Sequence, residues 1–385
     1  MKTYTYLEES ILKLFMAIHL DLSKPLKKTL SELIVCLLEN NKAHISKMGE
    51  NISTEGAGIM ACIQRIRRFL SNKRISPSIT VIPLIYLMRP LLQRLPEIVL
   101  IMDRTEWEKR LKYINILSVA VSYKGRALPL FWIVFGRKGC SSFEQWKHVL
   151  TPVIEGLRQM DWLFDKLVHV LGDREFGSPK LAEWLKCTYD IDSTLRIKSS
   201  IYLNSDYTPE TKVATLIKNM VKGTRHILYN QTLTRDSSFK MNVLLTWKEE
   251  YDEPLVVATT SGNPAIADKT YGKRVDIESM HKDWKTNAFD LEKTRVTNPK
   301  RIETLLIVIA FAYVLCVLEG DQKEISGDVR EPPKGKTRMV GLFLSGLRTI
   351  SRHLRRADIK KFKRFIFQLL LPIFNVWNIR PSAVL

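Results

Sequence analysis

Apolar residues recur every three or four positions in residues 1–95, as in LEESILKLFMAIHL and LSELIVCLLENN. This spacing gathers them on one face of a helix and predicts a helical N-terminal region. Pro83 and Pro90 interrupt the last of these segments, and Pro96 closes it. We therefore expect a small helical domain over residues 1–95.

The pattern changes near residue 96 to shorter apolar runs. EIVLIMDRTEW (97–107) predicts a strand, and YINILSVAVSYKGRALPLFWIVFG (113–136) predicts two strands around a Lys124-Gly125 turn. SSFEQWKHVLTPVIEGLRQM (141–160) starts with a Ser cap and predicts a helix. KLVHVLGDREF (166–176) predicts a further strand, and PKLAEWLKC a short helix. This order of elements is typical of an α/β layer fold.

The segment from about residue 190 to 262 holds β-type runs separated by polar turns, among them RHILYNQTLT, MNVLLTWKEE and EPLVVATT. It predicts an all-β insertion within a domain over residues 96–320. A helix is expected over 271–285, and a very apolar one over 302–318. The uncharged run from Leu305 to Leu318 is too short to span a bilayer, so we expect a buried helix and no membrane partner.

The last region, residues 321–385, begins with a linker containing Gly327, Pro332, Pro333 and Gly335. It continues as HLRRADIKKFKRFIFQLLLPIF, which mixes cations with bulky apolar residues. This basic helical region either contacts DNA, packs on a second subunit or completes the core. Helical regions at both ends of the chain would then flank the α/β core.

Charge changes this picture, because the net charge of the 385-residue chain is +20. Such a field attracts polyanions, although a basic but otherwise ordinary enzyme would also carry it. Arg65, Arg67 and Arg68 belong to a basic run that either binds DNA phosphates or is a solvated helix face. The five Cys include no CxxC pair, which argues against a zinc ribbon or a disulfide framework and fits a reducing cytoplasm.

Three acids are candidate catalytic residues and metal ligands. Asp103 and Asp173 each end an apolar run, and side chains at strand ends of an α/β sheet enter a crevice. Glu278 shares an arc of roughly 60° on its predicted helix with Tyr271, Arg274 and Lys285. Carboxylates suit Mg²⁺, and two ions roughly 4 Å apart can drive phosphoryl transfer.

Less specific interpretations of the same residues stay open. An Asp at a strand end commonly makes a turn or a helix cap, and Glu278 has Arg274 and Lys282 as helical neighbours to pair with. His281 follows Glu278 by three residues, as in half of a di-iron motif, but no second Glu-x-x-His occurs. His281 is therefore either a neighbour of phosphate or a structural residue.

With these residues the chain resembles the DDE transposases of bacterial insertion sequences, specifically the insertion-sequence-4 family. The family signature is Tyr, two residues, Arg, three residues, Glu, six residues and Lys, and the spacings within YGKRVDIESMHKDWK match it. MDRTEW and LGDREF are similar to the two Asp motifs of the family, and RIRRFLSN to its N-terminal regions. The resemblance implies a ribonuclease-H-like catalytic core with a β-rich insertion before the glutamate helix.

The resemblance also implies a function, namely cut-and-paste DNA transposition in the bacterial cytoplasm, at the nucleoid. It implies a catalytic, metal-binding triad of Asp103, Asp173 and Glu278 with two Mg²⁺ or Mn²⁺ ions. Tyr271, Arg274 and Lys285 would contact phosphates of double-stranded DNA, at the terminal inverted repeats and the target. A homodimer on DNA is expected, with each subunit acting on one end.

One departure from the family concerns the tryptophan that stacks on a flipped base during hairpin formation in relatives. The matching position here is Leu255. Trp247, one strand earlier, either takes over this DNA contact or packs in a sheet. The rival functions are a nuclease on the same core that cuts without joining, and an inactive or domesticated DNA-binding protein. A basic RNA-binding protein is a further rival, but the chain lacks a module such as an RRM.

Overall fold

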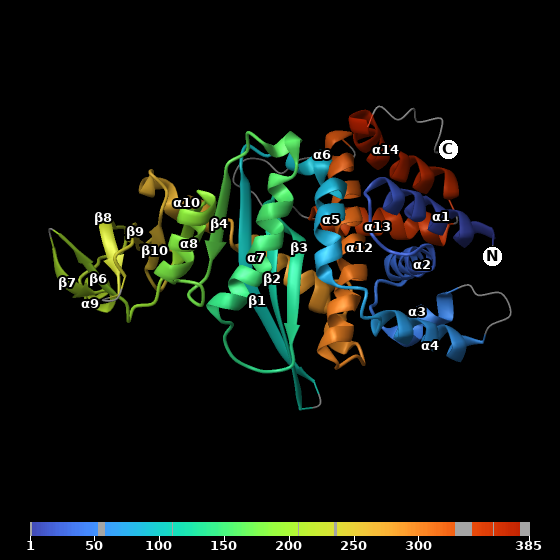
Figure 1. Ribbon diagram of the computed structural model, residues 1–385, viewed down its shortest axis with the longest axis horizontal. Helices are drawn as coiled ribbons and strands as arrows, with labels where there is room; N and C mark the ends of the chain where they lie inside the picture. The colour runs from blue at the N-terminus through green and yellow to red at the C-terminus, as the bar shows by residue number, and fades with distance from the viewer. Residues whose placement is uncertain are drawn as a thin grey trace.

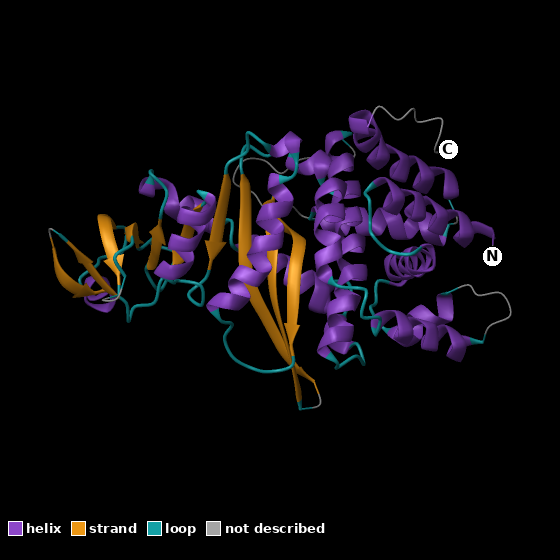
Figure 2. Cartoon of the chain, viewed as in Figure 1, coloured by secondary structure: helices purple, strands orange, loops and turns teal. Residues whose placement is uncertain are grey.

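The computed structural model describes residues 2–52, 58–109, 111–206, 208–234, 237–327, 341–356 and 358–377. Pro332, Pro333 and Gly335 of the predicted linker lie outside the described residues. A central sheet occupies the left and middle of the view in Figure 1, and a helical layer lies to its right. Figure 2 shows the same division between strands and helices.

The N-terminal region is helical, as its apolar spacing predicts. Its elements are α1 (Lys2–Ala17), α2 (Lys24–Asn40), α3 (Ile45–Asn51), α4 (Ile59–Leu70), α5 (Val81–Leu87) and α6 (Arg89–Leu92). Helix α3 was not predicted. Helix α2 is buried along its centre, with Leu33, Ile34 and Leu37 fully enclosed, so these helices belong to the main core rather than to its surface.

Ten strands form one mixed sheet in the order β3-β2-β1-β4-β5-β10-β9-β8-β6-β7. Their bounds are β1 (Ile98–Lys109), β2 (Lys112–Tyr123), β3 (Arg126–Phe135), β4 (Val168–Gly172), β5 (Asp192–Arg196), β6 (Tyr202–Ser205), β7 (Thr208–Lys212), β8 (Arg225–Leu233), β9 (Lys240–Thr246) and β10 (Leu255–Thr259). Strands β1, β4 and β5 are parallel, and the other pairs are antiparallel. The predicted mixed α/β class with a ribonuclease-H-like core is confirmed.

Two predicted local features of the core are present. The β2–β3 hairpin turns at Lys124 and Gly125, whose φ angles of 46° and 79° are both positive, as a tight two-residue hairpin requires. Helix α7 (Phe143–Arg158) starts at Ser142, which forms a capping box with Gln145. Local chemistry therefore sets the ends of these elements.

Helices cover both faces of the sheet, and strand β3 shows how. Phe131 meets His148 of α7, with ring centroids 5.9 Å apart. Its neighbour Trp132 points the other way and meets Trp284, at 6.4 Å. Because successive strand residues face opposite sides, α7 and the segment of Trp284 lie on opposite faces. Helix α8 (Pro179–Tyr189) lies beside α7 in front of the sheet in Figure 1.

The β-rich segment extends the core sheet. Strand β10 pairs with β5, and β9, β8, β6 and β7 follow outward to the left end of the molecule in Figure 1. The segment also contains one short helix that the sequence pattern did not predict, α9 (Val213–Lys218). Because β5 pairs in parallel with β4, the end of β4, which Asp173 follows, lies next to the end of the first strand of this segment.

The very apolar segment forms α12 (Pro299–Ile325), which begins at the N-cap residue Asn298. By length and composition α12 could cross a membrane, but 94% of its most apolar window is buried within the protein. The predicted buried helix is thus confirmed. Helices α13 (Leu342–Arg355) and α14 (Ile359–Trp377) follow.

The apolar face of the C-terminal region completes the core. Phe343, Leu347 and Ile350 of α13 and Phe362 and Ile366 of α14 are buried. Helix α13 packs on α12 and α2, and α14 packs on α1. Of the three expectations for this region, completion of the core is the one observed within the chain.

Candidate active site

Strand register brings the first two candidate acids together. Strands β1 and β4 pair in parallel from Ile98–Val168 to Met102–Gly172. Asp103 and Asp173 are the next residue on each strand, so they lie side by side at the edge of this pairing. Asp103 was expected at a strand end, and this detail is wrong, because β1 continues to Lys109 along β2. Only its pairing with β4 ends there.

One regular helix was expected over residues 271–285, and this prediction is wrong for the segment that carries Glu278. It consists of α10 (Ala267–Gly272), α11 (Val275–Lys282) and a π-helical turn, η4 (Asp283–Asn287). Between α10 and α11 the backbone makes tighter bonds to residues three positions back, including Arg274 N to Tyr271 O at 2.9 Å. Gly272, a poor helix former, precedes this turn. The predicted buried stripe of Ile277, Met280 and Trp284 is nevertheless present.

Arg274 lies among the three carboxylates. Its Nη1 atom is 3.8 Å from Asp103 Oδ2 and 4.0 Å from Asp173 Oδ2. Its Nη2 atom donates a hydrogen bond to Glu278 Oε1. The guanidinium therefore supplies the positive charge that these acids require. The pairing of Glu278 with Arg274, expected as a simple alternative, is present together with the convergence of all three acids.

The three acids offer only carboxylate oxygen atoms as possible metal ligands. Among the described residues, no group of three His, Cys, Asp or Glu side chains is arranged to hold a metal ion. The acids face the guanidinium of Arg274 instead. Carboxylates are the ligands that hard divalent cations prefer, and here they already surround a positive charge. The chemistry of the three groups thus fits a divalent cation.

Asp103 is the most buried of the three acids, with 14% of its side chain exposed against 34% for Asp173 and 50% for Glu278. Burial raises the pKa of Asp103 to about 6, and the nearby acids Asp173 and Glu278 add to this effect. The charge of Arg274 opposes it. A carboxyl group with so strongly shifted a pKa is typical of a functional site.

His281 supports Asp103 from inside the protein. Its Nδ1 atom is 3.7 Å from Asp103 Oδ2, and its Nε2 atom is 2.9 Å from Ser118 Oγ on β2. The ring is buried, and burial lowers the pKa of His281 to about 3, so the imidazole is neutral. Burial and the Ser118 contact are typical of a structural residue, and the ring also borders the pocket that the acids line, so both interpretations of His281 stay predictions.

Asp173 is held by groups from three parts of the chain. Tyr271 donates a hydrogen bond from its hydroxyl to Asp173 Oδ1 at 3.2 Å, and the backbone N–H of Arg174 donates to the same oxygen at 2.7 Å. Arg196 Nη1 lies 4.0 Å away. Sequence reasoning missed Arg196, although it ends β5 next to β4 and the strand-end rule that selected Asp173 would have found it.

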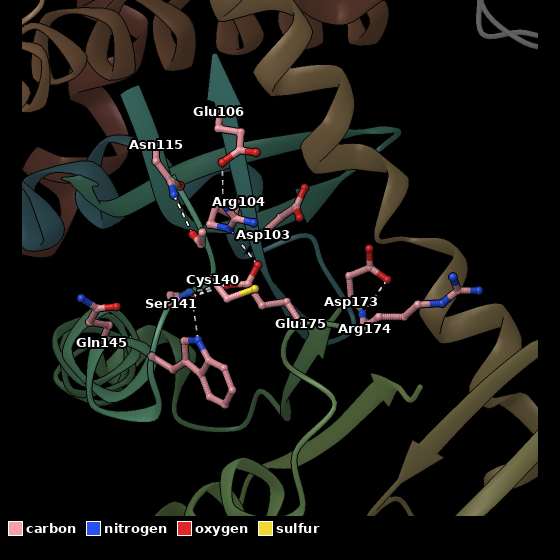
Figure 3. A network of polar contacts seen from close by, with 12 residues as sticks. Asp103, Arg104, Glu106, Asn115, Cys140, Ser141, Gln145, Asp173, Arg174 and Glu175 are labelled. Atoms are coloured by element: carbon pink, nitrogen blue, oxygen red, sulfur yellow. Dashed lines mark hydrogen bonds and ion pairs between the residues drawn. The ribbon is translucent and has the colours of Figure 1, made fainter. Parts of the chain in front are cut away.

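A second missed residue is Glu175, which organises the network in Figure 3. Its carboxylate accepts a hydrogen bond from Arg104 Nε at 2.7 Å and two from Ser141, from the backbone N–H at 2.7 Å and the hydroxyl at 2.5 Å. Ser141 Oγ in turn accepts from Trp146 Nε1 of α7 at 2.8 Å. Glu175 thereby connects β1, the turn after β4 and the start of α7 around the two aspartates.

Lys285 lies in the π-helical turn and reaches back over β1. Its Nζ atom is 3.3 Å from Thr105 Oγ1 and 3.0 Å from Glu292 Oε1, and it lies over the Trp107 ring. Lys285, Arg274 and the three acids line one open pocket of about 440 Å³. The predicted site residues Asp173, Arg274, Glu278 and Lys285 thus line the same pocket as Asp103. Tyr271 contacts this pocket through its hydrogen bond to Asp173.

The predicted DNA contacts of the N-terminal region separate into two groups. Arg65 faces inward, where it pairs with the buried carboxylate of Glu32 and donates to Thr29 Oγ1 at 3.1 Å. Arg67 and Arg68 are exposed. Arg65 is therefore engaged in contacts within the protein, whereas Arg67 and Arg68 face outward on α4.

Trp247 and Leu255 lie at either side of the β9–β10 connection. The indole N–H of Trp247 donates to Tyr251 O at 3.0 Å, and the ring is half-buried against the core. Leu255 begins β10 and packs against a small cluster that contains Leu244, Val257 and Tyr271. Stacking of Trp247 on a base stays a prediction.

The chain was compared with known families. A family model described as the transposase DDE domain matches residues 94–315, which is more than half of the chain. The matched span runs from just before β1 into α12 and contains the three acids with their pocket. No curated protein matches the chain.

Proposed function

The chain belongs to the family of transposases with a DDE domain, and from this premise we propose that it cuts and joins DNA at the ends of an insertion-sequence-4 element. Its enzyme class is therefore phosphoryl transfer in DNA transposition. The proposal adds a cut-and-paste course, in which a hydroxyl released at the element's end attacks another strand. The observation that carries it is the convergence of Asp103, Asp173 and Glu278 on one positive charge.

DDE transposases generally use divalent metals. We propose that the three acids hold two Mg²⁺ or Mn²⁺ ions, which when bound activate the nucleophile and stabilise the leaving oxygen of the phosphodiester. The neutral ring of His281 packs beside Asp103, and Tyr271 and Arg196 hold Asp173 at the cleft. Positioning of this kind is a large part of phosphoryl-transfer catalysis.

The cations of the pocket have a separate role in this proposal. Arg274 turns from the acids to a DNA phosphate, for which its planar fork is suited, and Lys285 supplies a point charge nearby. Tyr271 approaches the same backbone from beside Asp173. The family spacing supports all three assignments, and the shared pocket supports those of Arg274 and Lys285. They make double-stranded DNA with terminal inverted repeats the substrate.

We further propose a homodimer on DNA that acts in the bacterial cytoplasm, at the nucleoid. All five cysteines are free, which is consistent with a reducing compartment. The net charge of +20 supports a polyanionic partner. Division of the chain into a helical region over 1–95, a catalytic domain over 96–320 and a basic region over 321–385 belongs to the same proposal.

The test is a cleavage and joining assay with wild-type protein, Glu278→Gln and Glu106→Gln. The DNA carries the repeats that flank the gene, with Mg²⁺ or Mn²⁺. We expect Glu278→Gln to lose activity by more than about a hundredfold while it still binds DNA, because loss of a ligand exceeds the effect of outer groups. Glu106, on the same strand as Asp103 but paired with Arg104, serves as the control and should retain activity.

The products distinguish the rival functions. Cleavage without joined products would favour a nuclease, and binding without cleavage in the wild type would favour an inactive DNA-binding protein. Cleavage that survives Glu278→Gln would contradict the assignment of the triad. A hairpin product would show that the reaction tolerates Leu255 at the position of the stacking tryptophan.

A further inference from the structure

A large basic groove lies apart from the active-site pocket. It has a volume of about 1090 Å³ and lies between α3 and α4 on one side and the segment 293–301 on the other. Six cations line it, and no carboxylate does so among the described residues. They are Lys47, Arg67, Arg68, Lys293, Arg295 and Arg301.

One wall of the groove is the outer face of α4. Ile66, Phe69 and Leu70 of this helix are buried, and the cations Arg67 and Arg68 of its last turn are exposed. Helical periodicity therefore anchors the wall to the core and directs its charges outward. Among the described residues, neither arginine has an acidic partner.

The opposite wall is an extended segment that leads into α12. Thr294 and Val296 are buried and Arg295 between them is exposed, which is the two-residue alternation of an extended chain. Lys293, also exposed, ends the short 3-10 turn before it. Arg301 Nε donates to Ser71 Oγ at 2.8 Å and so connects this wall to the end of α4. In Figure 1 the start of α12 and helices α3 and α4 lie side by side at the lower right. The two walls are thus connected at Arg301 before any ligand binds.

The groove adjoins the active-site pocket. Glu292 lines the pocket, and the next residue, Lys293, lines the groove. Lys285 in the pocket pairs with Glu292, so a continuous stretch of chain connects the acids to the basic walls. The pocket and the groove are thus neighbours along the chain at residues 292 and 293.

We infer that this groove binds the phosphate backbone of the duplex DNA whose end lies at Asp103, Asp173 and Glu278. Lys47 pairs with Glu50 and Lys293 with Asp290, so the main evidence is the four arginines, for which no acidic partner is found among the described residues. Four such arginines on two walls match a polyanionic strand, because phosphate contacts position a duplex irrespective of its sequence. The inference rests on the proposed function and adds to it a second set of contacts. These contacts join Arg67 and Arg68 of the N-terminal region to Lys293, Arg295 and Arg301.

The test removes one charge from each wall, in the double variant Arg67→Gln/Arg295→Gln. Binding of a long duplex carrying the element's repeats is measured in chelator, without cleavage, over a series of salt concentrations. Each phosphate contact contributes about −0.9 to the slope of log K against log [salt], so we expect the slope to weaken by roughly 2. A matched control, Arg352→Gln/Arg356→Gln, removes the same charge from the exposed basic surface of α13 and its C-cap and should keep the wild-type slope.

A wild-type slope in the groove variant would overturn the inference, as would equal losses in both variants, because the effect would then be one of total charge. Preference for double-stranded RNA over DNA of the same length, dependent on Arg67 and Arg295, would also overturn it. Unfolding midpoints of all variants establish that the fold is retained.

Failure of the groove and failure of the proposed function give different results. If the wild type cleaves and joins DNA but the groove variant binds with an unchanged slope, the groove inference alone fails. If binding depends on Arg67 and Arg295 but the wild type never cleaves, DNA binding by the groove is supported and the transposase proposal fails.

Discussion

At the scale of single residues, the ionised form of Asp103 is costly in the protein without a metal. Its carboxyl group is largely buried, and burial raises its pKa from 3.8 to about 6 in spite of the nearby Arg274. A raised carboxyl pKa stabilises the folded state fully below the unfolded pKa, and this stabilisation is lost as the pH rises through the folded value. Above pH 6, ionised Asp103 therefore opposes folding.

We accordingly predict that Asp103→Asn stabilises the metal-free protein at pH 8 by up to about 3 kcal/mol, while it abolishes cleavage. The gain should shrink as the pH falls from 6 toward 4, where the wild-type carboxyl group becomes protonated. Urea unfolding in chelator at several pH values measures it. Asp165→Asn, at an exposed position, should show no such trend. A variant less stable than wild type at pH 8 would contradict the assigned burial cost.

At the scale of elements, α12 and α13 cross with their backbones in contact. A Cβ atom added to Gly346 would collide with the carbonyl oxygen of Cys316, and one added to Gly320 would collide with that of Leu342. Both glycines are required for this close approach rather than for a special backbone angle. The crossing holds the helix that ends the family-matched span against the C-terminal region.

Gly346→Ala is therefore predicted to destabilise the protein by about 3 kcal/mol, because backbone atoms cannot move aside as a flexible side chain can. Gly272→Ala is the matched control, since an added Cβ there has no neighbour within 4 Å and alanine favours a helix. Chemical denaturation of both variants gives the comparison. If both variants had the same free energy of unfolding, α12 and α13 could move apart without loss of stability, and the prediction would be contradicted.

At the scale of the whole molecule, the two ends of the chain share one helical layer. Helix α1 packs on α14, and α2 packs on α12 and α13 (Figure 1). The hydroxyl of Ser351 on α13 donates to the carbonyl oxygen of Leu38 on α2 at 2.6 Å. Buried residues of the N-terminal helices, such as Leu33 and Leu37, thus depend on parts of the chain that follow much later.

A fragment of residues 1–95 should for this reason lack a cooperative fold, even though its helices are correctly indicated by their apolar spacing. Without α12, α13 and α14 its apolar faces are exposed to water, and short helices are marginal in isolation. Circular dichroism during heating, with dye binding as a second probe, provides the measurement. A sharp unfolding transition in the fragment would instead support an independent N-terminal domain.

Much of the fold follows from local patterns. The apolar spacing indicates most of the helices of residues 1–95, and the Lys124-Gly125 turn and the Ser142 cap lie where their chemistry requires. Helix α3 has seven residues, too few to show a helical period, and α9 has only six residues within a β-rich segment. Such elements depend on their neighbours more than on their own residues.

The sequence by itself determined the spacing of Tyr271, Arg274, Glu278 and Lys285, since this is a property of neighbouring positions, and it indicated Asp103 and Asp173 through the apolar run before each. Only the tertiary structure decided that β1 and β4 align Asp103 with Asp173. It also decided that Arg274 faces all three acids, that Arg65 turns inward to Glu32 and that α4 meets the segment 293–301 in one groove. The physical reason is that apolar periodicity specifies which face of an element is buried. Which elements then pack against each other depends on contacts between residues far apart in the chain.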